Sequence, residues 1–184
     1  IRLCPKNANT TLKYCWNKLI NNENSDVSPL IRADSYQYYL KLGQIKSNDN
    51  EFLFRTNSYK IAIKRDPIKR ALSAATWILQ AQNIINPTIK QIELCIDTLC
   101  PNNDFHFYTQ YFWMGVKDQY DEIYDIKDVN KLLDFLEKDY PYKTTISNRH
   151  KNKSKASVES KQLSDKILNK LKTIYQIDYD NGWC

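Results

Sequence analysis

Apolar positions along this chain follow two spacings, one typical of helices and the other of strands. Helical spacing is found in residues 10–20, 67–82, 87–99, 129–138 and 156–177. Strands are indicated at residues 1–4 and 59–64, and shorter strands at 52–55, 114–116 and 123–125. A further helix is expected to follow Ser28 and to run as far as Leu42. The pattern therefore predicts a chain in which strands and helices alternate.

The two main strands each lead through a short loop into a helix. Units of this kind pack as a parallel sheet covered by helices, and they bind ligands at the carboxyl ends of the strands. The chain has 184 residues, enough to bury about 70% of the surface of its unfolded form. It contains no internal repeat and no dividing linker. We therefore expect one domain over residues 1–184, an α/β fold of three layers with a parallel central sheet flanked by helices.

The loop after the first strand contains residue types that suit an anion. Lys6 offers a point charge, and Thr10 and Thr11 offer hydroxyl donors. The helix that follows adds unpaired N–H groups and the positive end of its dipole. A phosphate or sulfate group fits such a loop, although the glycine spacing of a Walker A loop is absent because no glycine precedes Gly43. The alternative interpretation is a simple helix cap at Asn9 or Thr10 after an edge strand.

The second main strand is followed directly by Arg65, Asp66 and Pro67. Proline is favoured in the first turn of a helix, and Asp66 is expected to be the N-cap residue. Ser73 lies about two turns further along the helix. Arg65 would end its strand on the same rim of the sheet as Lys6, where a planar guanidinium and a hydroxyl suit a phosphate. The alternative is a surface Arg–Asp pair beside a helix cap.

These two segments resemble the cofactor loops of sulfotransferases that use 3′-phosphoadenosine 5′-phosphosulfate (PAPS). Residues 5–11, Pro-Lys-Asn-Ala-Asn-Thr-Thr, are similar to the 5′-phosphosulfate loop of the Golgi-type carbohydrate sulfotransferases. Residues 65–73 resemble the 3′-phosphate motif of that family, Arg-Asp-Pro-x-x-Arg-x-x-Ser. The resemblance implies a P-loop-like sulfotransferase fold. It also implies that PAPS is bound by Pro5, Lys6, Asn7, Ala8, Asn9, Thr10, Thr11, Arg65 and Ser73.

Two segments in the middle of the chain extend the resemblance with departures. Residues 103–110, Asn-Asp-Phe-His-Phe-Tyr-Thr-Gln, resemble the Asp-x-His-Trp-x-Pro-Gln segment of the family. Phe107 stands there in place of tryptophan, and Thr109 in place of proline. Residues 113–125 resemble the section in which a strand leads to an acidic helix, but they lack its usual Cys-x-x-Cys.

Two later segments follow in the order that the family shows. Residues 149–154 are similar to its His-x-Asn-x-Ser/Thr loop, and residues 174–180 to its terminal Tyr-x-x-Asp-Tyr signature. The first likeness implies a contact with the nucleotide by Asn152, Lys153 and Ser154.

The resemblance implies transfer of a sulfuryl group from PAPS to an acceptor hydroxyl by in-line displacement, which leaves 3′,5′-adenosine bisphosphate. Lys6 is expected to stabilise the negative charge that builds on the leaving phosphate. His106, which lies in an aromatic stretch, is the candidate general base, with Asp34 and Asp104 as the alternatives. The interpretation without catalysis is an imidazole hydrogen-bonded to the backbone. No metal ion is expected, because the sequence contains no cluster of ligands for one.

Two other functions stay open. A small kinase would share the phosphate site, although Gly-Lys-Ser/Thr and a clear aspartate for Mg²⁺ are missing. A non-catalytic module that binds polyanions would need only a basic face such as residues 143–155 and the net charge of +6. Such a module would leave the arrangement of Arg65 and Ser73 without a role. The expected partner is a glycan or small-molecule acceptor rather than a nucleic acid, and the acceptor is expected to contact residues 21–50 and 100–113.

The cysteines indicate the redox state of the cellular compartment in which the protein is expected. Their odd number, with no metal-ligand spacing, favours free thiols in a reducing environment over a lone disulfide. Glycosylation sequons at Asn9 and Asn152 fall inside the expected cofactor loops, where a glycan would obstruct the site. No apolar run is long enough to cross a membrane. We therefore expect a cytoplasmic protein, while an anchor upstream of Ile1 stays open because the chain starts inside an expected strand.

Overall fold

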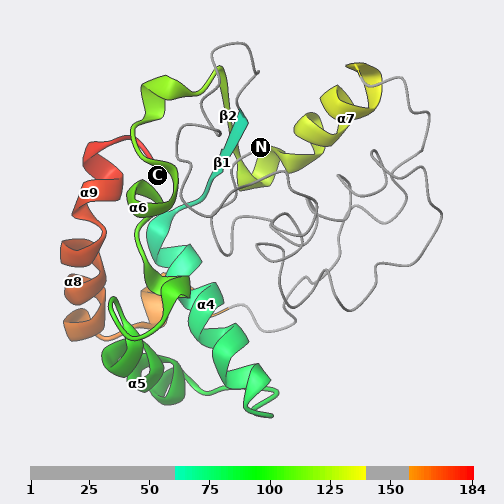
Figure 1. Cartoon of the computed structure of the whole chain (residues 1–184). Helices are drawn as coiled ribbons and strands as arrows, with labels where there is room; N and C mark the ends of the chain where they lie inside the picture. The colour runs from blue at the N-terminus through cyan, green and yellow to red at the C-terminus, as the bar shows by residue number, and fades with distance from the viewer. Residues whose placement is uncertain (1–60, 140–157) are drawn as a thin grey trace, which may run out of the picture.

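The computed structural model describes residues 61–139 and 158–184 (Figure 1). Its helices in this part are α4 (Pro67–Ala81), α5 (Ile89–Leu99), α6 (Gln110–Met114), α7 (Val129–Asp139), α8 (Asp165–Ile174) and α9 (Gln176–Asp180). Short 3₁₀ helices are η2 (Phe105–Phe107), η3 (Lys117–Gln119), η4 (Ile126–Asp128) and η5 (Ser160–Gln162). The expected elements at residues 1–4, 10–20, 28–42 and 52–55 lie outside the described ranges.

Strands β1 (Ile61–Lys64) and β2 (Glu122–Asp125) form a parallel pair. Ile61 lies opposite Glu122 and Lys64 opposite Asp125, so the carboxyl ends of both strands meet at one edge. A parallel pair needs a long crossover connection, which here contains α4, α5 and α6. The described part is therefore mixed α/β, mostly helical, with a two-stranded parallel sheet.

The start of α4 agrees with the N-cap and first-turn proline that the sequence predicts. The Asp66 side chain accepts a hydrogen bond of 2.7 Å from the backbone N–H of Lys69, and Pro67 is the first helical residue. This confirms the predicted cap. The helix ends before Asn83, which has a positive φ of 67°, a conformation that asparagine tolerates better than most residues.

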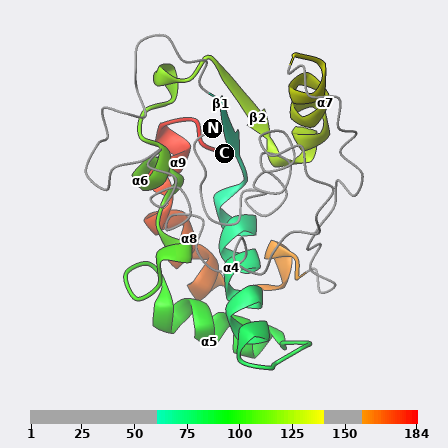
Figure 2. The same ribbon diagram turned by 45° about the vertical axis from the view of Figure 1, so that its right-hand side comes forward.

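The main core lies where α4 packs against α5 and α8 (Figure 2). Small residues on α4 allow the close approach, and larger apolar side chains of the other elements fill the space between them. Its fully buried members include Ala71, Ala74, Ala75, Ile92, Ile96, Phe107, Leu171 and Tyr175. A second, smaller cluster of Ala62, Met114 and Trp183 joins β1 to α6 and the C-terminal segment.

Two predicted elements differ from the structure. Residues 156–177 were expected to form one helix, but they include η5 and α8, and the chain turns at Tyr175 into α9. Polar side chains divide this segment, because Glu159 and Gln162 form a capping box at η5, and α8 then begins separately after Ser164. Residues 114–116 were expected to be a strand. Instead α6 ends at Met114, and the chain turns at the next residue.

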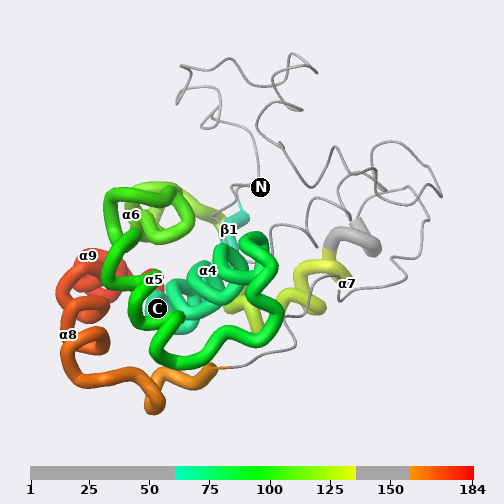
Figure 3. Tube along the Cα trace, turned by 90° about the horizontal axis from the view of Figure 1, so that it is seen from below, coloured from blue at the N-terminus to red at the C-terminus, as the bar shows by residue number. Residues whose placement is uncertain are grey.

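The tube of Figure 3, seen from below, shows α8 and α9 on the opposite side of α4 from α7. Within the described ranges, no helix combines the length and the apolar character that a membrane crossing requires. Cys95, Cys100 and Cys184 are free thiols, and the other cysteines lie outside those ranges.

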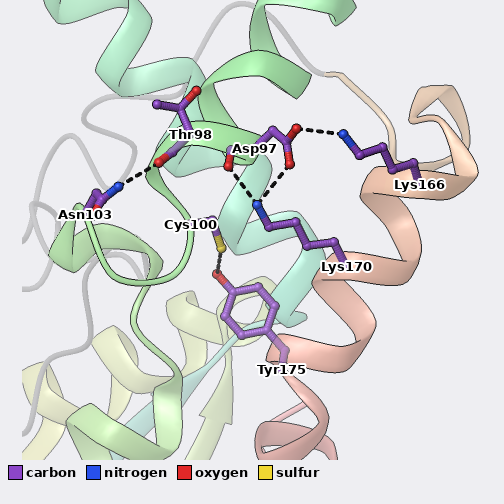
Figure 4. Close-up of polar contacts among 7 residues, drawn as sticks. All are labelled: Asp97, Thr98, Cys100, Asn103, Lys166, Lys170 and Tyr175. Carbon is purple, nitrogen blue, oxygen red and sulfur yellow. Dashed lines mark hydrogen bonds and ion pairs between the residues drawn. The ribbon is translucent and has the colours of Figure 1, made fainter.

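An ion-paired contact joins α5 to α8 (Figure 4). Asp97 of α5 accepts hydrogen bonds from the ammonium groups of Lys166, at 2.8 Å, and Lys170, at 3.0 Å. Lys170 also reaches the backbone carbonyl of Asp97 at 2.8 Å. These hydrogen bonds, first that of Lys166, lower the pKa of the Asp97 carboxyl below its ordinary value.

The stabilisation that Asp97 provides should depend on pH. A carboxyl whose pKa is lowered by folding stabilises the protein above its ordinary pKa, and this contribution is lost as the pH falls through the lowered value. We expect Asp97→Asn to lower the urea midpoint at pH 6, and the difference from wild type to shrink below about pH 4. Asp118→Asn, at an exposed aspartate with no ion pair to the described residues, is the control and should show little difference at either pH. A deficit of the Asp97 variant that persists at pH 2 would contradict this account.

Gly115 is required by the turn after α6. It has φ 69° and ψ −148°, a region essentially restricted to glycine, and an added Cβ would lie 2.7 Å from Nε2 of Gln119. We expect Gly115→Ala to lower the free energy of unfolding by about 2 kcal/mol in chemical denaturation. Gly182→Ala is the matched control, because its φ is also positive but its Cβ would lie 3.4 Å from the flexible side chain of Lys117. Equal losses for the two variants would show that the contact with Gln119 has no influence.

Candidate functional site

The candidate site is built on the turn between β1 and α4. Arg65 follows the last residue of β1, and Asp66 then caps α4. The Arg65 side chain is half-buried, and burial lowers the pKa of its guanidinium below the ordinary value. The neighbouring Arg70 lowers this pKa further, while Asp66 opposes the shift. A bound anion would therefore relieve an electrostatic cost at this position.

Arg70, the second arginine of the motif, is completely buried. Its Nη1 donates a hydrogen bond of 3.0 Å to the carbonyl of His106, and its Nη2 donates to the carbonyl of Tyr108. The guanidinium carbon lies 5.3 Å from the centre of the Tyr175 ring, within the range of a cation–π contact. The structure thus gives Arg70 a structural role, which is to hold residues 106–108 against α4.

Ser73 lies half-buried on the same side of α4 as Arg70 and Trp77, because residues three and four apart share a helix face. It is about 10 Å along the helix from the Asp66 cap, at 1.5 Å per residue. The indole ring of Trp77 lies 4.6 Å, centre to centre, from the imidazole of His106. The helix face that contains Ser73 is therefore the face against which His106 packs.

His106 is paired with Asp104. Its Nδ1 lies 2.7 Å from Oδ1 of Asp104, and the same oxygen accepts the backbone N–H of His106 at 2.8 Å. The Phe105 ring lies 4.0 Å from the imidazole, whose side chain is 13% exposed. A carboxylate on Nδ1 fixes the ring orientation and makes Nε2 the nitrogen that can take up a proton. Two of the three predicted candidates for the base, His106 and Asp104, thus lie together, as an oriented imidazole and the carboxylate that orients it.

The C-terminal segment fixes the same stretch of chain from the other side. The Tyr175 hydroxyl donates a hydrogen bond of 2.8 Å to the carbonyl of Phe107. The two carboxylate oxygens of Asp178 accept the backbone N–H groups of Gln110, at 2.9 Å, and Tyr111, at 2.8 Å. Burial raises the pKa of the Asp178 carboxyl, and these two N–H groups oppose that shift. The Tyr-x-x-Asp-Tyr segment therefore places a negative charge at the start of α6.

Sequence reasoning recognised the motifs that contain Arg70, Gln110, Tyr175 and Asp178 but assigned these four residues no role. A usable signal was present for Arg70. It lies between Ile68 and Ala71 in a strongly apolar stretch of the helix, where a charged residue needs buried partners. Nothing in the spacing of the sequence named those partners.

Several predicted site residues lie outside the described ranges. These are Asp34, Pro5, Lys6, Asn7, Ala8, Asn9, Thr10, Thr11, Asn152, Lys153 and Ser154. Among the residues that the structure does describe, no group of three or more His, Cys, Asp or Glu side chains could hold a metal ion.

Comparison with known proteins gives no match to this chain, whether with protein-family models, with curated proteins or with solved structures. The function of the chain is therefore inferred from the geometry of the described residues and from the motifs of the sequence.

The buried guanidinium of Arg70 should contribute strongly to stability. Arg70→Met keeps much of the side-chain volume but leaves the carbonyls of His106 and Tyr108 without their charged donors. We expect the free energy of unfolding to fall by about 3 kcal/mol, since a hydrogen bond to a charged group contributes roughly 1.5–3 kcal/mol. Lys69→Met, at the exposed neighbouring position, is the control and should change the free energy by less than about 0.5 kcal/mol. Equal stabilities in urea denaturation would contradict the structural role of Arg70.

Proposed function

We propose that this protein is a PAPS-dependent sulfotransferase that moves a sulfuryl group to an acceptor hydroxyl. One observation carries the proposal. The residues of the Arg-Asp-Pro-x-x-Arg-x-x-Ser pattern form a strand end, a cap and a helix at the carboxyl end of a parallel strand, and the His106–Asp104 pair packs against that helix. The carboxyl edge of such a sheet is where ligands of α/β proteins bind.

The 3′-phosphate of the cofactor is proposed to bind Arg65 and Ser73. A phosphate beside Arg65 would reduce the cost of its desolvation and of the neighbouring positive charge of Arg70. The carboxylate of Asp66 already accepts the Lys69 N–H, so it serves the helix cap at this turn. In this proposal β1 is one strand of a larger parallel sheet, and the whole chain is a single three-layer domain of the P-loop-like sulfotransferase type.

The proposed reaction is an in-line displacement at sulfur. The acceptor oxygen forms a bond to sulfur while the bond from sulfur to the 5′-phosphate oxygen breaks, and the products are a sulfate ester and 3′,5′-adenosine bisphosphate. Lys6, with the loop of residues 5–11, stabilises the charge on the leaving phosphate. Nε2 of His106 takes up the acceptor proton, and Asp104 stabilises the resulting imidazolium.

Aromatic side chains around His106 support an acceptor with both an apolar face and hydroxyl groups. Trp77 is 46% exposed and Phe105 is 51% exposed, and both rings lie against the imidazole. Phe112, which is 61% exposed, continues this surface through its contact with Trp113. A sugar ring can place its C–H face on such rings while an edge hydroxyl reaches the base. A glycan or a small alcohol is therefore the proposed acceptor class, and the free thiols are compatible with the proposed cytoplasmic location.

Calorimetric titration separates this proposal from its competitors. We expect micromolar binding of 3′,5′-adenosine bisphosphate and little binding of ATP with Mg²⁺. A preference for ATP with Mg²⁺ would favour a kinase-like phosphoryl transferase. Binding of neither nucleotide, together with binding to a polyanion such as heparin, would favour the non-catalytic module.

Variants should then separate the roles of the site residues. With labelled PAPS and a panel of sugars and alcohols, we expect Lys6→Ala to abolish turnover and Arg65→Ala mainly to weaken binding of the bisphosphate. His106→Gln should lower kcat by roughly 10²–10⁴-fold, the usual contribution of a general base, with little change in that binding. Lys69→Ala is the control for charge on the exposed side of α4. Normal turnover by both the Lys6 and Arg65 variants would show that the site assignment is wrong.

A further inference from the structure

The side chain of Gln110 holds both backbone groups of Arg65. Gln110 is completely buried at the first position of α6. Its Oε1 accepts the backbone N–H of Arg65 at 3.0 Å, and its Nε2 donates to the carbonyl of Arg65 at 2.8 Å. One amide therefore pairs with the N–H and the C=O of a single residue, as a neighbouring strand would.

This pairing occurs where the sheet stops. The last pair in the register of β1 and β2 is Lys64 with Asp125, so the backbone of Arg65 lies just beyond the ladder. Backbone groups that leave a sheet in a partly buried region need other partners. Gln110 provides them, and it thereby extends the strand geometry by one residue at the point from which the Arg65 guanidinium projects.

Gln110 is itself held in place by the C-terminal segment. Its Nε2 also donates to the carbonyl of Trp183 at 2.6 Å, and its backbone N–H donates to Asp178. The backbone N–H of Trp183 in turn donates to the carbonyl of Asp178 at 2.7 Å. Figure 1 shows the resulting arrangement, with α6 and α9 beside the carboxyl end of β1. The amide that holds Arg65 is thus fixed from two directions.

We infer that Gln110 is a positioning residue for the 3′-phosphate subsite, an inference that rests on the proposed function. It acts through Arg65, because it fixes the backbone from which the guanidinium extends toward the phosphate. A bidentate contact between a guanidinium and a phosphate depends on orientation as well as on charge. Loss of the Gln110 amide should therefore reduce discrimination for the 3′-phosphate, while the rest of the nucleotide binds as before.

A double-mutant cycle on the full chain tests this inference. The dissociation constants of 3′,5′-adenosine bisphosphate and of 5′-AMP, which lacks the 3′-phosphate, are measured by calorimetry, and their ratio gives the discrimination. We expect Gln110→Met to reduce this ratio about tenfold, because the Arg65 guanidinium would still be present but misplaced relative to the 3′-phosphate. The affinity for 5′-AMP should change less than about twofold. In the Arg65→Met background, Gln110→Met should cause no further reduction, because the residue through which it acts is gone.

Gln119→Met is the matched control. Gln119 is a partly buried glutamine whose Nε2 likewise donates to a backbone carbonyl, that of Met114, at 2.6 Å and away from Arg65. Its replacement should leave the ratio unchanged. If Gln110→Met does not fold, Gln110→Asn can take its place in the cycle, because it keeps a neutral amide but is one methylene too short to pair with both backbone groups of Arg65.

The outcomes distinguish the inference from the proposed function. If the wild-type protein does not discriminate between the two nucleotides, the proposed function fails, and the inference fails with it. If the wild type discriminates and the Gln110 variant keeps the full ratio, the inference alone is overturned. A reduction of equal size in the Arg65→Met background, or an equal loss of affinity for both nucleotides, assigns Gln110 a general structural role and also overturns it.

Discussion

The described structure depends on one buried cation. Removing a guanidinium from water costs several kcal/mol unless it gains hydrogen-bond partners in the protein. Arg70 gains two, the carbonyl groups of His106 and Tyr108, and it lies beside the ring of Tyr175, while its Nε has no hydrogen-bond partner among the described residues. Because carbonyl groups have to point at α4 for this purpose, the path of the segment is constrained. The position of the His106 imidazole beside Trp77 follows from that path.

A buried carboxylate completes the arrangement. Asp178 binds the first N–H groups of α6, a position where negative charge is favoured by the helix dipole. The positive charge of Arg70 also lowers the pKa of Asp178, against the larger effect of burial. A cation and an anion therefore hold one short segment from two sides, each through backbone groups. The candidate base His106 and the Gln110 amide both belong to that segment. The same buried charges therefore hold in place both the proposed base and the residue that contacts Arg65.

The sequence predicted those structural features that are determined by residues close together along the chain. The cap at Asp66, the helices that begin near Pro67 and Thr88, and the strand that includes Ile123 are confirmed, because caps, helical spacing and β-branched residues are local signals. The single helix over 156–177 and the strand over 114–116 were wrong, because capping side chains and a glycine turn outweighed the apolar spacing. The contact of Gln110 with Arg65 joins residues 45 positions apart, and spacing along the chain contains no information about such a pair.

The same long separations have a consequence for how the protein is made. Asp178 and Trp183 contact Gln110 across 68 and 73 residues, and Tyr175 contacts Phe107 across 68. During translation, α4 and α5 leave the ribosome long before these partners exist. The polar groups of residues 106–111 therefore lack their partners until residues 175–183 have been synthesised. Contacts between residues far apart along the chain also form more slowly than local ones. Until then the apolar faces of α4 and α5 lack the side chains of α8 that cover them, and exposed apolar surface makes such an intermediate prone to aggregation.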